Sequence, residues 1–289
     1  MGILVTGGSG FIGSHVVDKL IDKNLDVKIF DIKKPHREDV EFIRGDIASL
    51  EELKVAMEDM EYIFHIAAFS NINKIAENPL KAVDLNIMST AKVLETARSC
   101  GVERIIYASS YFVDSGEGHL YTTTKTASEM LCKDYYTLYG LPFTILRYGT
   151  AYGPRSRNED VISIFIRRAL SHQPLIIHGN GTQSRNFIYV EDLAEGNVAA
   201  LQNIAKNKTY NLEGMRSITV KEVAESVKKL IGDIIIEYKE GRLDDFEGGA
   251  ILTDKAKREL GWEPKVNFED GIRKCIERYR ENDPYKNVV

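Results

Sequence analysis

Short apolar runs alternate with longer stretches of helical spacing along the first half of the chain. The runs typical of buried strands are Ile3–Thr6, Val27–Phe30, Glu41–Arg44, Tyr62–Ile66, Arg104–Ala108 and Phe143–Arg147. Between them, the spacing predicts helices over Phe11–Lys23, Ser49–Asp59, Pro79–Cys100 and Tyr121–Tyr139. Steady alternation of strand and helix requires parallel strands joined by right-handed crossovers. We therefore predict an α/β fold with a doubly wound parallel sheet of the Rossmann type.

Two details sharpen the predicted helices. Ser49 followed by Glu52 is typical of a capping box, in which each residue satisfies the other's backbone N–H. The helix from Pro79 has an apolar stripe that we expect to cover the sheet, and further apolar residues off that stripe remain for a partner. The stripe comprises Leu80, Val83, Ile87, Ala91 and Leu94, and the residues off it are Leu85, Met88 and Val93.

The alternation is lost after Tyr148, beginning at Gly153-Pro154. We expect residues 1–150 to form a nucleotide-binding Rossmann domain and residues 151–289 to form mainly a smaller substrate-binding lobe. We also expect the chain to return to the first domain at about 186–212. Asn186–Val190 and Thr209–Leu212 are the two segments expected to rejoin the main sheet.

Composition excludes several classes of function. The chain has 289 residues and a net charge of −5, which argues against a nucleic-acid binder, because neutralising phosphates requires a basic excess. No apolar run approaches the roughly 18 residues of a membrane span. Cys100, Cys132 and Cys275 are widely separated, which indicates reduced thiols and a cytoplasmic location. Nothing in the spacing of potential ligands predicts a metal site.

A glycine-rich turn follows the first predicted strand and opens the first helix. Gly7, Gly10 and Gly13 form a GxxGxxG pattern that also includes Phe11 and Ile12. Glycines let the backbone turn tightly and approach a pyrophosphate, while the helix N-terminus offers N–H groups and a positive dipole end. The strand–turn–helix context therefore predicts a dinucleotide site at these residues.

Three further positions extend this predicted cofactor site. Asp31 ends the second strand, where a carboxylate binds the adenosine ribose hydroxyls and repels a 2′-phosphate, so it favours NAD over NADP. Asp46-Ile47 follows the third strand, where the carboxylate can meet the adenine amino group. Ala67 lies at the end of the fourth strand, where a small side chain lets a cofactor lie flat. We interpret the nearby His65 as a core histidine rather than a ligand.

Tyr121 and Lys125 stand four residues apart in a predicted helix, so their side chains share one face. Ser110 ends the preceding strand, at the edge of the sheet where doubly wound folds bind ligands. A lysine ammonium and a cationic nicotinamide both favour the phenolate of a nearby tyrosine. Tyr121 could then remove a hydroxyl proton while hydride leaves the same carbon, with Ser110 sharing the hydrogen bond.

The combination resembles the extended short-chain dehydrogenase/reductase family, the NAD-dependent nucleotide-sugar epimerases and dehydratases such as UDP-galactose 4-epimerase. The matching segments, which span nearly the whole chain, are Thr6–Gly13, His65–Ala68, Asn86, Tyr107–Ser110, Tyr121 with Lys125, Arg147-Tyr148, Tyr152–Arg155, Gly179–Asp192 and Leu260–Pro264. The resemblance implies a catalytic triad of Ser110, Tyr121 and Lys125. It also implies a homodimer that pairs the helices at 79–100 and 121–140.

The resemblance implies further binding residues. The NAD set would be Gly7, Gly10, Phe11, Ile12, Gly13, Asp31, Asp46, Ile47, Ala67, Asn86, Tyr121, Lys125 and Tyr148. The nucleotide-sugar set would be Ser110, Thr150, Arg185, Arg242, Asp245 and Gly249, with the two arginines on the diphosphate and Asp245 on the nucleoside ribose. Gly249 falls where relatives limited to plain hexoses have a tyrosine, so N-acetyl sugars are expected to fit.

The chain departs from the family pattern near the catalytic serine. The usual Val-Tyr-Gly is Val113-Asp114-Ser115, the segment before Tyr121 is short, and Thr150 replaces a common asparagine. Tyr111-Phe112 stands where dehydratases have Asp-Glu, so there is no acid or base for elimination. We therefore predict a UDP-glucose/UDP-galactose 4-epimerase that works through a transient 4-keto sugar. Another dehydratase or reductase of the family, and a non-catalytic nucleotide sensor on the same fold, remain alternatives.

Overall fold

The structure is a computed structural model that describes residues 1–115, 119–241 and 249–281. The chain forms two compact units. The first unit comprises Met1–Tyr148, Leu193–Leu212 and Thr253–Glu263, and the second comprises the remaining described residues. Thr253–Glu263 was expected in the C-terminal lobe, but its contacts place it in the first unit.

A seven-stranded parallel sheet forms the centre of the first unit, in the order β11-β6-β5-β4-β1-β2-β3. The strands are β1 (Gly2–Thr6), β2 (Asp26–Asp31), β3 (Glu41–Arg44), β4 (Tyr62–His65), β5 (Arg104–Ser110), β6 (Phe143–Tyr148) and β11 (Lys208–Leu212). This confirms the predicted doubly wound fold. The order reverses between β1 and β4, whose ends meet where Thr6 pairs with His65. Such a switch point is where open α/β sheets bind ligands.

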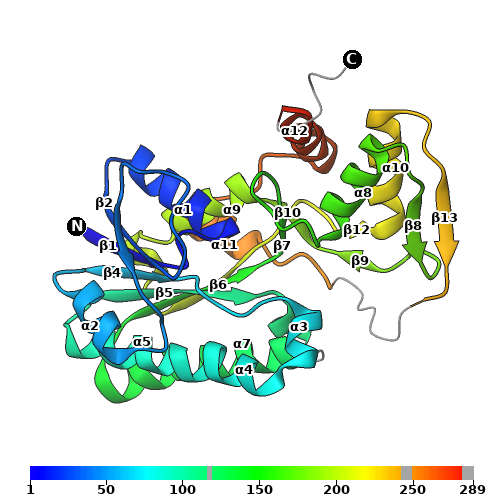
Figure 1. Cartoon of the computed structure of the whole chain (residues 1–289). Helices are drawn as coiled ribbons and strands as arrows, with labels where there is room; N and C mark the ends of the chain where they lie inside the picture. The colour runs from blue at the N-terminus through cyan, green and yellow to red at the C-terminus, as the bar shows by residue number, and fades with distance from the viewer. Residues whose placement is uncertain (116–118, 242–248, 282–289) are drawn as a thin grey trace. The chain divides into compact units, whose positions relative to one another are not determined.

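Helices cover both faces of this sheet, which explains why its central strands are mostly apolar (Figure 1). One face carries α1 (Phe11–Asp22), α11 (Asp254–Leu260) and the part of α9 (Val190–Ala199) that belongs to this unit. The other face carries α2 (Leu50–Met57), α4 (Pro79–Val83), η1 (Asp84–Met88), α5 (Ser89–Ser99) and α7 (Leu120–Tyr139). Shorter helices are α3 (Ile72–Glu77), α6 (Phe112–Ser115) and η2 (Asn203–Ala205).

The predicted long helix from Pro79 is interrupted by a turn of π-helix, η1. A π turn takes up an extra residue, so the apolar stripe of a regular helix cannot continue across it. The expected stripe is accordingly wrong. Leu80 is 84 % exposed and Val83 is also exposed, whereas Val93, which was expected to lie off the stripe, is buried together with Leu94.

The predicted capping box of α2 is only half formed. The hydroxyl of Ser49 accepts the Glu52 N–H at 3.3 Å, as expected. The Glu52 carboxylate instead accepts the backbone N–H of Asp46 at 2.7 Å. The turn before the helix offers this alternative donor, so Glu52 links the helix to the end of β3.

The second unit is built from three strand pairs and three long helices. β7 (Thr150–Tyr152) pairs with β10 (Phe187–Tyr189), β9 (Ser184–Arg185) with β12 (Ile218–Thr219), and β8 (Leu175–His178) with β13 (Ile236–Lys239). The helices are α8 (Val161–Leu170), α10 (Val220–Ile231) and α12 (Phe268–Glu281), which enclose an apolar core with the strands. None of the helices in the described ranges is both long and apolar enough to cross a membrane.

The expected return of Asn186–Val190 to the main sheet is wrong, because β10 pairs with β7 in the second unit. The backbone around Gly149 explains this pairing. A Cβ at Gly149 would lie 2.4 Å from the carbonyl oxygen of Asn186, so only glycine allows the two segments to approach. The Thr150 N–H then donates to that carbonyl at 2.8 Å. Thr209–Leu212, the other expected segment, does join the main sheet as part of β11.

Candidate active site

The glycine-rich turn packs β1 against α1 so closely that two positions exclude any side chain. Gly7 has a positive φ of 73°, and a Cβ there would lie 2.7 Å from the backbone nitrogen of Ala67. A Cβ at Gly13 would lie 2.1 Å from the Gly7 carbonyl oxygen. These two glycines therefore serve the turn itself.

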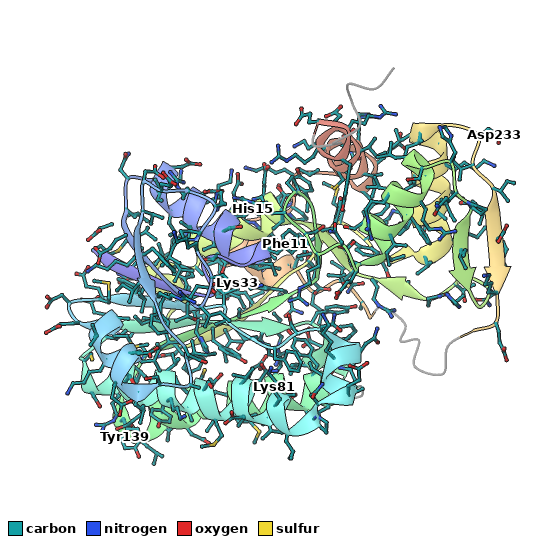
Figure 2. The ribbon with its side chains drawn as sticks, viewed as in Figure 1. Phe11, His15, Lys33, Lys81, Tyr139 and Asp233 are labelled. Atoms are coloured by element: carbon teal, nitrogen blue, oxygen red, sulfur yellow. The ribbon has the colours of Figure 1, made fainter. Side chains whose placement is uncertain are left out.

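The N-terminus of α1 fits the pyrophosphate of a dinucleotide. Gly10 is the N-cap residue and is exposed, and no side chain caps the helix among the described residues. No acidic residue stands in the first turn, so the positive end of the helix dipole is not offset there. Phe11 and Ile12 follow, both half-buried. Figure 2 marks Phe11 at the start of α1 and Lys33 just beyond β2.

Asp31 joins the glycine turn to the end of β2. Its carboxylate accepts the backbone N–H groups of Ser9 and Lys33, each at 3.0 Å. The Ser9 hydroxyl also donates to the Lys33 carbonyl at 2.7 Å. The structure thus places Asp31 at the expected position beside the turn, with its carboxylate bonded to backbone N–H groups.

A pocket of about 330 Å³ lies at the ends of β2 and β3. It is lined by Ile32, Arg44, Gly45, Asp46 and Glu52. Asp46 was singled out from the sequence, but Ile32 and Arg44 were not. The sequence could have indicated Ile32 and Arg44 as well. Each lies at or directly after the carboxyl end of a predicted strand next to the candidate adenosine site.

His65 is a buried, hydrogen-bonded core residue, which confirms the interpretation from the sequence. Its Nδ1 lies 2.8 Å from the Thr6 hydroxyl and its Nε2 lies 3.1 Å from the Thr90 hydroxyl. Burial, helped by the nearby charge of Lys125, lowers the pKa of His65 to about 3. The imidazole is therefore neutral and links β1, β4 and α5.

Asn86 lies in the π turn and holds the segment that follows Ala67. Its Oδ1 accepts the Phe69 N–H at 2.8 Å, and its Nδ2 donates to the Phe69 carbonyl at 2.9 Å. Nδ2 also lies 3.0 Å from the Thr124 hydroxyl on α7. The amide thus connects this segment to the helix that carries Tyr121 and Lys125.

Lys125 is 3 % exposed and lies beneath the candidate catalytic tyrosine. Its Nζ donates to the Ala108 carbonyl at 2.6 Å and lies 5.8 Å from the centre of the Tyr121 ring. Burial lowers the pKa of Lys125 to about 8, although Cys132 and Glu129 raise it in part. The ammonium is therefore still the main form at neutral pH.

Ser110 ends β5, and Tyr121 lies near the start of the helix that carries this lysine. Ser110 is the last residue of the strand, is buried, and its hydroxyl accepts the Phe112 N–H at 3.4 Å. Tyr121 is half-buried in the first turn of α7. The N-cap of α7 is His119, whose imidazole accepts the Thr122 N–H at 3.3 Å and lies 5.8 Å from the Tyr121 ring, centre to centre.

Tyr148 lies opposite Ser110 in the β5–β6 register. Its hydroxyl donates to Asn197 Oδ1 at 2.5 Å, and burial raises its pKa well above the ordinary value. The hydroxyl of Tyr148, which was expected to bind NAD, thus bonds to α9 in this structure.

Apart from Ser110, which belongs to the first unit, the expected sugar-binding residues belong to the second unit or lie outside the described residues. Thr150 is the first residue of β7, and Arg185, in β9, donates to the carbonyl of Ser184 at 2.7 Å. Gly249 is exposed, and among the residues that the structure describes no atom lies within 4 Å of a Cβ built there. Arg242 and Asp245 lie outside the described residues. No cluster of three or more potential metal ligands occurs in residues 1–115, 119–241 and 249–281.

Comparison with known proteins gives consistent matches over nearly the whole length. Residues 3–212 match the model of the NAD dependent epimerase/dehydratase family. A Methanocaldococcus jannaschii protein with the provisional name UDP-glucose 4-epimerase is 35 % identical, over 97 % of this chain and 99 % of its own. The Thermotoga maritima UDP-glucose 4-epimerase solved with UDP-glucose has a TM-score of 0.92 at 30 % identity, covering 97 % and 99 % of the two chains. The Thermus thermophilus UDP-glucose 4-epimerase solved with NAD has a TM-score of 0.89 at 29 % identity, covering 98 % and 100 %.

Proposed function

The chain belongs to the NAD dependent epimerase/dehydratase family, and on that premise we propose that it inverts C4 of a nucleotide-linked hexose, interconverting UDP-glucose and UDP-galactose. NAD is the cofactor of the family, and the uncapped, glycine-lined N-terminus of α1 fits its pyrophosphate. The observation that carries the proposal is the buried ammonium of Lys125 near the Tyr121 ring, bonded to the Ala108 carbonyl two residues before Ser110 in β5.

The chemistry of these side chains suits proton transfer at a sugar hydroxyl. A tyrosine phenol has an ordinary pKa near 10, too high for a base at neutral pH. The positive charge of Lys125 near the Tyr121 ring stabilises the phenolate, and it lies where water cannot screen it. Ser110 adds a hydroxyl that can share a hydrogen bond with the C4 oxygen.

The reaction balances as two opposite transfers. Tyr121 takes the proton of the C4 hydroxyl as the C4–H bond breaks, which leaves a 4-keto sugar. Bound NAD would supply the hydride acceptor and donor for C4. The keto sugar turns over before the return, and Tyr121 gives the proton back to the C4 oxygen. The product therefore differs from the substrate only in its C4 configuration.

The residues after Ser110 support epimerisation over dehydration. Loss of water across C5 and C6 needs an acid for the leaving hydroxyl and a base for C5. The two residues after Ser110, where we expect a dehydratase to have its acid and base, are Tyr111 and Phe112. Their rings are stacked with 4.3 Å between the centres. The next acidic residue, Asp114, is paired with Arg147. A non-catalytic sensor would have no need of the Tyr121–Lys125 arrangement.

Further parts of the proposal concern the substrate and the setting. We assign the diphosphate to Arg185 and Arg242, the nucleoside ribose to Asp245, and the sugar to Thr150 and Gly249. All three cysteines, each within the described residues, are free thiols, which supports a cytoplasmic location.

The test is incubation of the purified protein with UDP-glucose, followed by chromatographic separation of UDP-glucose from UDP-galactose. We expect the same equilibrium mixture from either sugar. A 4-keto-6-deoxy product would instead identify a dehydratase. Binding of UDP and NAD without turnover of any UDP-hexose would identify a sensor.

A further inference from the structure

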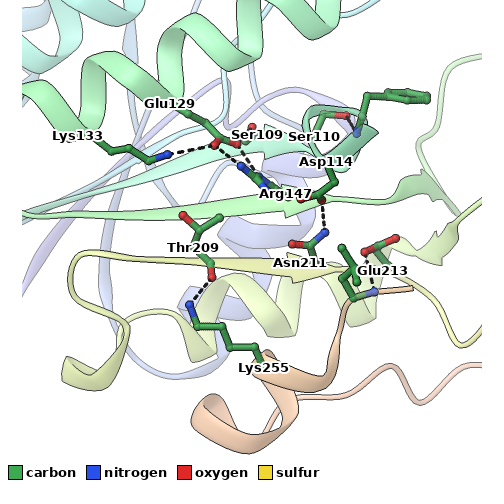
Figure 3. A network of polar contacts seen from close by, with 12 residues as sticks. Ser109, Ser110, Asp114, Glu129, Lys133, Arg147, Thr209, Asn211, Glu213 and Lys255 are labelled. Atoms are coloured by element: carbon green, nitrogen blue, oxygen red, sulfur yellow. Dashed lines mark hydrogen bonds and ion pairs between the residues drawn. The ribbon is translucent and has the colours of Figure 1, made fainter. Parts of the chain in front are cut away.

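Charged side chains form a connected group near Ser109 and Ser110, and Arg147 of β6 is its centre (Figure 3). The Nε and one terminal nitrogen of Arg147 donate to the two carboxylate oxygens of Glu129 at 2.9 and 2.7 Å. Its other terminal nitrogen donates to Asp114. Glu129 is 2 % exposed, so its carboxylate depends on these partners.

Glu129 connects this group to the candidate catalytic residues. It stands four residues after Lys125 on α7, one helical turn further along the same face. Its carboxylate also accepts the hydroxyl of Ser109 at 2.6 Å, and Ser109 is the neighbour of Ser110. The Arg147 fork fixes the direction as well as the distance of the carboxylate, because both of its bonds must be met together.

Asp114 connects the group to the segment that follows Ser110. It lies in α6, a helix of four residues, which is too short to be stable by its own hydrogen bonds. One carboxylate oxygen accepts from Arg147, and the other accepts from Asn211 Nδ2 of β11 at 2.6 Å. Asp114 thus ties α6 to two strands of the sheet.

We propose that Asp114, Arg147 and Glu129 are positioning residues that set Ser110 against Tyr121 and Lys125, with Asp114 holding the short segment after the serine. The inference rests on the proposed function. Loss of Asp114 should misplace the serine while the buried Arg147–Glu129 pair maintains the fold.

The test compares Asp114→Asn with the exchange variant Asp114→Asn/Asn211→Asp. The single variant removes the negative charge that pairs with Arg147 and, with the Asn211 amide oriented as it is, sets two amide donors against each other at residues 114 and 211. The exchange variant restores one donor and one acceptor and leaves an oxygen for Arg147. We expect kcat to fall at least tenfold in the single variant, with KM changed less than threefold, and to recover most of its value in the exchange variant. Glu95→Gln, which breaks the exposed pair with Arg98, is the matched control and should keep full activity.

A second measurement does not depend on turnover. Hydrogen exchange of peptides that contain residues 109–113 should be faster in Asp114→Asn and return to the wild-type rate in the exchange variant. The inference is overturned if Asp114→Asn leaves the hydrogen-exchange rate of these peptides unchanged, or if it raises that rate without lowering kcat. In either case the proposed function stands. If the wild-type protein turns over no UDP-hexose, the proposed function fails, and the exchange rates alone decide whether Asp114 positions the segment.

Glu129→Gln tests the other end of the group through the pH profile. The groups that face Lys125 are Tyr121, Glu129 and Cys132 from α7, Tyr107 from β5 and His65 from β4. Among them, Glu129 raises the pKa of Lys125, so its neutralisation lowers that pKa. We expect the alkaline limb of kcat/KM to move to lower pH by about 0.5 unit or more. An unmoved limb in a folded variant contradicts the role of Glu129.

Discussion

Tyr121 and Lys125 lie one helical turn apart, and only the tyrosine carries the proton in the proposed reaction. Tyr121→Phe removes one oxygen and leaves the packing of α7 intact. We expect kcat to fall by about 10²–10⁴-fold, the usual contribution of a general acid–base group. NAD affinity should stay within a few-fold of wild type by fluorescence titration.

The control for this variant is Tyr139→Phe, at the last turn of the same helix and exposed (Figure 2). It should show wild-type turnover. Turnover of Tyr121→Phe at the wild-type rate would remove the basis of the mechanism.

His65 makes the stability depend on pH. Its pKa of about 3 in the folded state is well below the unfolded value near 6.5, so the unfolded chain binds more protons between these limits. The stabilisation is complete above about pH 6.5 and is lost as the pH falls. Below pH 6.5 the loss of unfolding free energy due to His65 should steepen, reaching about 1.4 kcal/mol per pH unit near pH 5.0.

Urea unfolding of wild type and His65→Gln at several pH values measures this term. The glutamine variant should be less stable at pH 7 but show a shallower decline on acidification. Parallel declines of the two proteins would mean that another group is responsible.

Under the proposed function, we expect Gly249 to influence the choice of sugar. No atom of the described residues lies within 4 Å of its Cβ position, so we expect room there for an acetamido group. We expect UDP-N-acetylglucosamine to be epimerised alongside UDP-glucose, and Gly249→Tyr to lose the N-acetyl substrate selectively. Equal loss of both substrates, or a wild-type protein inactive on the N-acetyl sugar, would contradict this role.

At the scale of elements, the π turn η1 places Asn86 where a regular helix would not. Asn86→Ala removes three hydrogen bonds and leaves the N–H and carbonyl of Phe69 without that partner. We expect the unfolding free energy to fall by about 2–3 kcal/mol, because unsatisfied buried groups cost about 1–3 kcal/mol. NAD affinity should also weaken, since the segment after Ala67 adjoins the glycine turn.

Asn78→Ala is the matched control for this prediction. Asn78 precedes Pro79 and makes a single exposed side-chain contact of 3.3 Å with the Lys74 carbonyl. Its stability should change by less than about 0.5 kcal/mol. Equal effects of the two variants would show that the π turn contributes nothing specific.

At the scale of the whole molecule, the helical layer of α4, η1, α5 and α7 carries large exposed apolar side chains. Leu80 and Met88 come from the first part of this layer, and Met130 and Leu138 come from α7, where Leu138 is 68 % exposed. Apolar groups concentrated on one face of a soluble protein typically mark an interface. We propose that this layer pairs with its copy in a homodimer.

Light scattering at micromolar concentration should give the dimer mass for the wild-type protein. Met88→Glu combined with Met130→Glu should shift the mass toward the monomer, because the charges would be buried without partners. The control is Ile235→Glu, an exposed apolar residue of the second unit, which should remain dimeric. A monomeric wild type would refute the interface.

The sequence alone determined whatever depends on local pattern. Apolar runs alternating with helical spacing were enough to predict the parallel sheet, because burial on both faces makes the central strands mostly apolar. The strands from β1 to β6 begin and end within two residues of the predicted bounds. The glycine turn could also be predicted from the sequence. Gly7 and Gly13 lie at close contacts between β1, α1 and the end of β4, and any side chain at these two positions would clash.

The tertiary structure alone decided what depends on partners far apart in the chain. The pairing of β10 with β7 rests on the approach of Asn186 to Gly149, and no periodicity within either segment encodes it. The π turn shifted the phase of a helix whose spacing had predicted a continuous stripe. In the sequence, Asp114 is only a departure from a family motif. In the structure, its carboxylate accepts hydrogen bonds from Arg147 and Asn211. The spacing of apolar residues is a local property of the sequence. The role of a buried charged residue, in contrast, depends on the residue that neutralises it.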